Sequence, residues 1–304
     1  MVDRISTFSQ HRKTVDDVLR VQGNLARIQG QISSGRKAST FGELGSDIRQ
    51  VLDLESSIKS TGRFVQSNQV VISRLKTMDT SISQLQSLAS DLSQQLALER
   101  SAVGADLDLT EFAKTTLARV SDSLNAQNAG RFLFAGSKTD LPPIAAGALN
   151  TSNIVNEAPS ASYYQGDSLK FSTKASLELD VEYGITANDE AFQDLIGALN
   201  FAIRSESSTG FGDDDLQSAI ALVESSLDKL GRLSSQVNTD IITLTSVNDQ
   251  HKRAEINLKE SLSDTIGTDV VEASIQAALN EAVLTATLQT FTSLSRLTLS
   301  EFLR

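Results

Sequence analysis

Apolar residues recur along this chain at intervals that place them on one face of an α-helix. The clearest run follows residue 213 and holds two series of positions in heptad register. The first series is Leu216, Val223, Leu230, Val237, Leu244 and Leu258, and the second is Ile220, Leu227, Ile241 and Leu262. A heptad pattern sustained over this length predicts a long coiled-coil helix.

A second stretch of the same kind covers residues 47–103. Its seam positions are Val51, Ile58, Val65 and Ile72 in one series, and Leu54, Leu75 and Ile82 in the companion series. Because the two stretches have similar lengths, each is the natural antiparallel partner of the other. Shorter helices are expected over residues 108–128 and 189–204.

Between these helices the pattern changes. Residues 131–183 contain all three Pro and all three Tyr of the chain. Apolar and polar residues alternate at Leu169, Phe171 and Thr173, and again at Leu177, Leu179, Val181 and Tyr183. This alternation is typical of β-strands, so we expect a small β-rich module with loops.

The N-terminal segment predicts a helix over residues 9–33, followed by a glycine-containing loop over residues 33–46. Its apolar positions, spaced by three, four or seven, are Ile5, Phe8, Val15, Val18, Leu25, Ile28 and Ile32. Gly35 suits the end of this helix.

The C-terminal segment after Gly267 predicts a helix that is apolar on more than one side. Between Ala273 and Ser300 its only charged residues are Glu281 and Arg296. One apolar stripe is Ile275, Leu279, Ala282 and Ala286, and another is Leu284, Leu288, Phe291 and Leu294. A helix with several apolar faces needs partners on several faces. We expect these partners to be the N-terminal helix and other copies of the chain.

Together these elements predict a mainly α fold with a small β module. The expected architecture is an elongated antiparallel helical bundle, or coiled coil, formed by the N- and C-terminal segments, with a β-rich tip inserted in the middle. Terminal segments 1–46 and 267–304 should pair with each other. Rod segments 47–130 and 189–266 should pair likewise, and residues 131–188 should form the tip.

Composition narrows the function classes. The net charge is −11, which argues against nucleic acids and anionic membrane surfaces as partners. The chain has no Cys, so it forms no disulfide and offers no thiolate. No apolar run reaches transmembrane length, and the first residues lack the apolar core of a secretory signal. Any export therefore uses a route that reads no cleaved signal.

Candidate chemistry is sparse. His11 and His251 are the only histidines, and only His251 has a carboxylate, Glu255, one helical turn away. Two ligands are too few for a metal site, and a tolerated polar pair in the helical seam is the better interpretation. No catalytic, phosphate-binding or cofactor-binding motif occurs, so we expect neither an enzyme nor a bound cofactor.

Several segments resemble bacterial flagellins, and more closely the hook–filament junction proteins related to them. The resemblance covers essentially the whole chain. The most specific part is the run from Asn128 to Asp140, with its Gly-Arg-Phe-Leu-Phe-Ala-Gly-Ser-Lys-Thr core, followed by Pro142-Pro143. The other segments are Arg4 to Thr7, Gln31 to Lys37, Tyr164 to Asp167, Glu255 to Leu258 and Leu297 to Leu303.

This resemblance implies a structural, non-enzymatic flagellar subunit that joins hook to filament. It implies export by the flagellar type III system, from the cytoplasm to an extracellular position at the hook–filament junction. The implied partners are other copies of the chain, a hook-side hook-associated protein, flagellin on the filament side and a cytosolic export chaperone at the C-terminal helix. We expect packing or chaperone contacts at Ile5, Phe8, Val15, Val18, Leu25, Ile28, Ile32, Ile275, Leu279, Leu284, Leu288, Phe291, Leu294 and Leu297.

Three alternatives stay open. A short filament flagellin belongs to the same class, although the run from Asn128 to Asp140 is more typical of the junction protein. A signalling coiled-coil bundle would have a symmetric hairpin, a membrane anchor and no β module. An unrecognised enzyme would need a site that the sequence does not offer.

Overall fold

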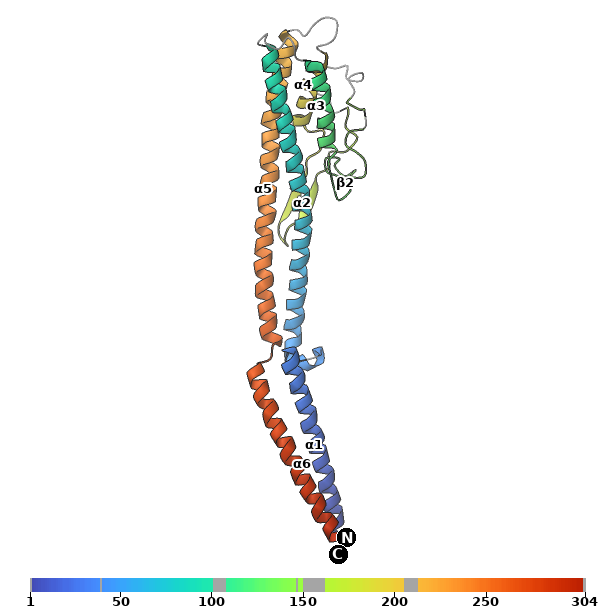
Figure 1. The fold of residues 1–304 in the computed structure, drawn as a ribbon, viewed down its shortest axis with the longest axis vertical. Coiled ribbons are helices and arrows are strands. Elements are labelled where there is room, and N and C mark those ends of the chain that lie inside the picture. The colour runs from blue at the N-terminus through green and yellow to red at the C-terminus, as the bar shows by residue number, and fades with distance from the viewer. Residues whose placement is uncertain are drawn as a thin grey trace. The chain divides into compact units, whose positions relative to one another are not determined.

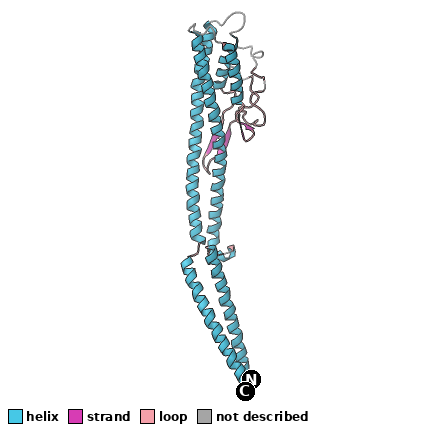
Figure 2. Cartoon of the chain, in the orientation of Figure 1, coloured by secondary structure: helices cyan, strands magenta, loops and turns pink. Residues whose placement is uncertain are grey.

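The described residues form a mainly helical fold with two small antiparallel sheets, in agreement with the predicted mainly α fold with a small β module (Figures 1 and 2). The computed structural model describes residues 2–38, 40–100, 108–145, 147–149, 162–204 and 213–302. Within these ranges the side chains of residues 2–11, 41, 204, 213 and 293–302 are not described. The chain forms two compact units. Unit 1 comprises Met1–Ser60 and Ala254–Arg304, and unit 2 comprises Thr61–Arg253.

Unit 1 is built on two terminal helices that lie side by side, α1 (Val2–Ser34) and α6 (Val270–Phe302) (Figure 1). It also contains the start of α2 (Ile48–Arg100) and the end of α5 (Asp213–Ile266). The expected loop after α1 is partly wrong. Residues Phe41–Asp47 form a 3-10 helix, interrupted at Gly45, whose φ of 57° is one that glycine adopts without strain.

Unit 2 has a continuous apolar core along the seam of α2 and α5. Both helices contribute buried aliphatic residues to this core. Those of α2 are Leu75, Ile82, Leu85, Leu92 and Leu96, and those of α5 are Leu216, Val223, Leu230, Val237 and Leu244. These are the predicted heptad positions and their continuation, so the heptad interpretation holds for this part of both helices. The seam therefore forms one continuous side of the apolar core that stabilises unit 2.

Two shorter helices extend this core, α3 (Leu109–Leu124) and α4 (Glu190–Arg204), which pack against each other. Asp108 caps α3 by accepting from the Glu111 backbone N–H at 2.9 Å. On α4 the buried Asp194 accepts from Lys229 Nζ of α5 at 2.7 Å. A buried carboxylate needs such a partner, so this ion pair fixes α4 on α5.

A polar layer interrupts the seam. Asn68 Nδ2 donates to Asn248 Oδ1 at 3.1 Å and to the Ala175 carbonyl at 3.0 Å. His251 Nε2 lies 2.9 Å from the same carbonyl oxygen, and its ring stacks on Phe64. His251 is thus a polar seam residue, and it contacts the β portion of unit 2.

The β portion is smaller than predicted. A hairpin pairs β3 (Phe171–Lys174) with β4 (Asp180–Tyr183), while Leu177 and Leu179 lie exposed in the intervening turn. The strands are short because Ala175 and Ser176 donate their backbone N–H groups to the Leu179 carbonyl and close the turn early.

A second, two-residue pairing joins β1 (Gln127–Asn128) to β2 (Arg131–Phe132). The predicted helix end near residue 128 is therefore too late, because α3 stops at Leu124. Ala129 and Gly130 both have positive φ, 51° and 76°, as a two-residue hairpin turn requires. The hairpin sends Phe134 into the core, where its ring meets Phe192 edge-on.

Two distant loops interlock beside this hairpin. Asp167 Oδ1 accepts from the Ser137 backbone N–H at 2.9 Å, and Asp167 Oδ2 accepts from the Ser137 hydroxyl. A Cβ on Gly136 would collide with Asp167, and one on Gly166 would collide with Tyr164. The two glycines therefore permit an approach that no larger residue allows.

Leu75→Ala tests the core of unit 2. Leu75 is fully buried, so its truncation should lower the free energy of unfolding of unit 2 by about 2–5 kcal/mol, measured by urea denaturation. Val70, on the same helix, is 59% exposed, and Val70→Ala should change that free energy by less than about 0.5 kcal/mol. Equal effects of the two substitutions would contradict the assigned core.

The interlocked loops predict an acid-sensitive contribution to stability. The hydrogen bonds from Ser137 lower the pKa of Asp167 below its ordinary value of 3.8. The contribution is therefore complete above about pH 4 and is lost as the pH falls through the lowered pKa. Asp167→Asn and Ser137→Ala should each lower the melting temperature at neutral pH. In acid, the difference in melting temperature between each variant and the unsubstituted protein should become smaller. A stability gap that is the same at both pH values would refute this linkage.

Candidate assembly surface on the terminal helices

The terminal helices meet along a seam with heptad spacing. On α1 the less exposed apolar residues are Val18, Val21, Leu25, Ile28 and Ile32, and on α6 the less exposed residues are Ala273, Ala277, Asn280, Leu284, Thr287 and Phe291. Both sets advance by alternate steps of three and four residues, as a coiled-coil pair requires. On α6, however, four of the six seam residues are small or polar, so this helix contributes little apolar area to the seam.

Apart from Leu284, the larger aliphatic side chains described on α6 lie exposed on the side away from the seam. These exposed side chains include Val271 (70%), Ile275 (58%), Leu279 (61%), Val283 (50%) and Leu288 (43%). The first four are spaced by four residues and so form one continuous ridge, which we call the outer ridge. On α1, Val15 and Leu19 are exposed in the same way. Singly exposed apolar residues are common, but an aligned row of four is typical of an interaction surface.

The structure divides the residues expected to make packing contacts into two groups. Val18, Leu25, Ile28, Ile32, Leu284 and Phe291 lie on the seam side, whereas Val15, Ile275, Leu279 and Leu288 are exposed. The side chains of Ile5, Phe8, Leu294 and Leu297, and that of His11, lie outside the described residues. Sequence reasoning missed Val271 and Val283, although both continue the four-residue spacing of Ile275 and Leu279.

The polar residues of α6 are compatible with burial against protein. The Thr285, Thr287 and Thr292 hydroxyls donate to backbone carbonyls three or four residues earlier, at 2.7 to 3.0 Å. Ser274 does the same to Val270 at 2.6 Å. Because these hydroxyls are satisfied within the helix, a neighbouring protein could cover α6 without leaving unpaired donors.

Charge also distinguishes the two helices. Over residues 12–34, α1 carries four basic and two acidic residues, whereas α6 carries two acidic and no basic residues over residues 270–292. This complementarity favours contacts between an α1 and an α6, whether they belong to one chain or to neighbouring copies.

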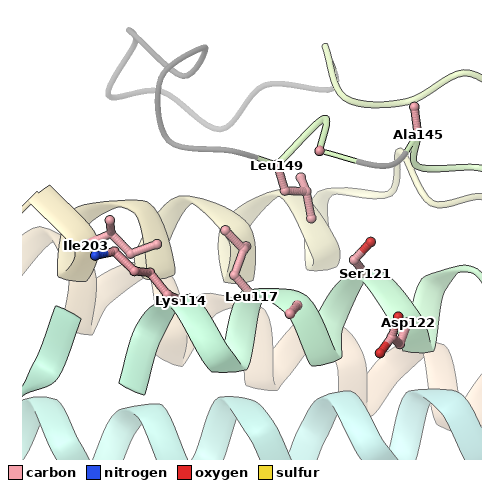
Figure 3. A pocket seen from close by; sticks show the side chains of 9 residues that line it. Lys114, Leu117, Ser121, Asp122, Ala145, Leu149 and Ile203 are labelled. Carbon is pink, nitrogen blue, oxygen red and sulfur yellow. The ribbon is translucent and has the colours of Figure 1, made fainter. Parts of the chain in front are cut away.

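The described part of the chain contains no group of three or more His, Asp or Glu side chains that could hold a metal ion. None of its helices combines the length and apolar character needed to cross a membrane. A hollow of about 500 Å³ in unit 2 is lined by α3, by the segment 145–149 and by Ile203 near the end of α4, and Asp122 is the only acidic side chain along its described lining (Figure 3). Lys114, Ser121 and Asp122 extend from α3 in Figure 3 without converging on a common point.

Comparison with known proteins identifies the N-terminal part of the chain. Residues 5–139 match the family of the bacterial flagellin N-terminal helical region. No curated protein sequence matches the chain.

Solved structures show the same fold at low identity. A Vibrio parahaemolyticus protein described as a flagellar hook-associated protein aligns with a TM-score of 0.59 at 13% identity, over 72% of this chain and 97% of that one. FlgL of Bacillus cereus aligns with a TM-score of 0.51 at 10% identity, over 66% of this chain and 98% of that one. At these identities the likeness concerns the fold.

The division of α6 into two faces predicts unequal effects of equivalent substitutions. Leu284→Asp places a charge in the seam and should destabilise the α1–α6 pair by about 1–3 kcal/mol. Leu279→Asp, on the outer ridge, should change monomer stability by less than about 0.5 kcal/mol. Limited proteolysis of the purified monomer measures this difference as the cleavage rate within residues 12–34 and 270–292. Equal cleavage rates in the two variants would show that the two faces are wrongly assigned.

Proposed function

Because residues 5–139 match the bacterial flagellin N-terminal helical region, we propose that this chain is a member of the flagellin family and a structural subunit of the bacterial flagellum that joins the hook to the filament. It acts without catalysis, by packing its terminal segments 1–46 and 267–304 against other subunits. The observation that carries this proposal is the outer ridge, an aligned apolar surface on α6 that the chain itself does not cover.

The energetics favour assembly through this ridge. Full burial of a Val, Leu or Ile side chain contributes roughly 1.5–3 kcal/mol, and a half-exposed one still has about half of that to gain. The four side chains of the ridge therefore offer roughly 3–6 kcal/mol for each contact that covers them. This gain offsets the cost of ordering the terminal helices in the assembled state.

We further propose that the subunit leaves the cytoplasm through the flagellar type III system and occupies an extracellular position at the hook–filament junction. Before export, a cytosolic chaperone covers the C-terminal helix, with Leu284, Leu288, Phe291 and Leu294 as its expected contacts. At the junction the neighbours are other copies of the chain, a hook-side hook-associated protein and flagellin. The fold shared with a Vibrio hook-associated protein and with Bacillus FlgL supports this role.

The second candidate is a short filament flagellin, which the flagellin N-terminal match also favours. Deletion of the gene separates the two roles. Loss of a junction subunit should leave hooks while flagellin monomer accumulates in the medium, whereas loss of one flagellin among several should leave filaments. Immunogold labelling should place the protein at the hook–filament boundary for the first role and along the filament for the second.

The double substitution Ile275→Ser and Leu279→Ser tests the outer ridge directly. Each change removes about 1 kcal/mol of burial from a contact, so the pair should weaken assembly more than tenfold. The variant should be exported and recovered as folded monomer in the medium, and immunoblots should show its loss from isolated flagella.

Val70→Ser with Ile242→Ser is the matched control. These residues are 59% and 68% exposed on α2 and α5 of unit 2, so the chemical change and the initial exposure are comparable. The control should assemble normally. Normal assembly of the ridge variant would refute the proposed role of the ridge.

A further inference from the structure

A short backbone clip joins the end of α1 to the junction between α5 and α6 (Figure 1). The Lys37 N–H donates to the Ile266 carbonyl at 2.7 Å, and the Thr268 N–H donates to the Gly35 carbonyl at 3.0 Å. Arg36 and Gly267 face each other between these bonds as an antiparallel bridge. We call residues 35–38 and 264–268 the clip, and all of them lie in unit 1.

Side chains reinforce the clip from both strands. Lys37 Nζ lies 3.4 Å from the Asp264 carbonyl oxygen and 3.3 Å from that of Thr265, at the C-terminal end of α5. These carbonyls have no partner within the helix, and a cation is favoured beside them. Gln31 Nε2 in turn donates to the Lys37 carbonyl at 2.5 Å, which holds the clip against the last turn of α1.

Each terminal helix is also capped at its clip end. Gly35 has a φ of 68° and donates to the Gln31 carbonyl at 2.8 Å, which ends α1. Asp269 Oδ1 accepts from the backbone N–H groups of Val271 at 2.9 Å and Glu272 at 3.1 Å, which starts α6. The ends of α1 and α6 that meet at the clip are therefore fixed in place.

The most buried side chains of α1 and α6 also lie near the clip. Within the described side chains of unit 1, the most buried are Ile28, Val51 and Ala273, which are 2%, 2% and 5% exposed. Ile28 lies seven residues before Gly35, and Ala273 lies six residues after Gly267, so both are within two helical turns of the clip. Towards the chain termini every described seam residue is partly exposed.

We infer that the clip is the anchor from which the α1–α6 pair closes, so that the two helices pair from the clip towards the chain termini and separate in the reverse order. The clip removes most of the loop-closure cost of bringing residues far apart in the sequence together. Each further turn then adds only a small seam contact, so the free energy of local opening decreases steadily towards the termini. This order of pairing is a property of the monomer and holds whether or not the chain assembles in a flagellum.

Amide hydrogen exchange on the full-length protein tests this order. Protection should be highest at the Lys37 and Thr268 amides and in the adjacent turns, and should fall along both helices towards residues 12 and 292. Uniform protection along the two helices, or protection that rises towards the termini, would overturn the inference.

Gly267→Ala tests whether the pairing of α1 with α6 depends on the clip. Its Cβ would lie against the Ser263 carbonyl oxygen, closer than a van der Waals contact, so the clip must shift. Exchange should accelerate about tenfold or more along the whole of α1 and α6, including amides far from the substitution. The amides of α5 between residues 230 and 245, in unit 2, should keep their protection and so report that the protein is folded.

Gly23→Ala is the matched control, because Gly23 lies within α1 and nothing lies within 4 Å of the added Cβ. Its exchange should be unchanged or slower, since alanine favours the helix. If Gly267→Ala accelerated exchange only within a turn of the substitution, the pair would not depend on the clip and the inference would fail.

Discussion

The structure depends on heptad seams that are closed with different side chains in the two units. In unit 2 the seam of α2 and α5 is filled by fully buried Leu, Ile and Val residues such as Leu75 and Leu230. In unit 1 the seam residues that α6 contributes include two alanines, an asparagine and a threonine. Since apolar area removed from water is the main favourable term, the same pattern gives a stable pair in one unit and a weak pair in the other.

The weak terminal pair and the outer ridge both follow from the distribution of residues around α6. Apart from Leu284, the large aliphatic residues described on α6 lie on the side away from α1, so they contribute little to the stability of the monomer. They can stabilise only a state in which another chain covers them. Because one chain presents an acidic α6 and a basic α1, its exposed faces are complementary to those of another copy, and contacts between unlike faces can extend into rings or helical polymers.

The long helices could be predicted from the sequence because their heptads repeat often enough to exclude other periods. The predicted ends of α2 and α5 lie within a few residues of the observed ends. Sequence reasoning was less successful where a single residue decides the chain path. The turn at Ala129 and Gly130 places an alanine at a positive φ, which residue preferences argue against, so the helix before it was extended too far. The interlock of Ser137 with Asp167 and the clip join residues far apart in sequence, and no local pattern signals them.

The sequence could not predict which contact residues of α6 face the seam and which are exposed, for a related reason. On a helix that is apolar on several sides, the spacing of Ile275 and Leu279 is as compatible with a seam as that of Leu284 and Phe291. Only the position of α1 decides which set faces inward. Four of the six inward positions hold Ala, Asn or Thr, whereas the outer ridge consists of Val, Ile and Leu.

The central claim is that other subunits cover the outer ridge of α6 on assembly. Amide hydrogen exchange of α6 in two states of the protein tests this claim most directly. The comparison is between purified monomer and the protein in isolated flagella, over residues 271–283, with residues 230–245 of α5 as an internal reference. Protection of α6 should increase strongly on assembly, whereas protection of α5 should change little. Equal protection of α6 in the two states would contradict a role of the outer ridge in assembly.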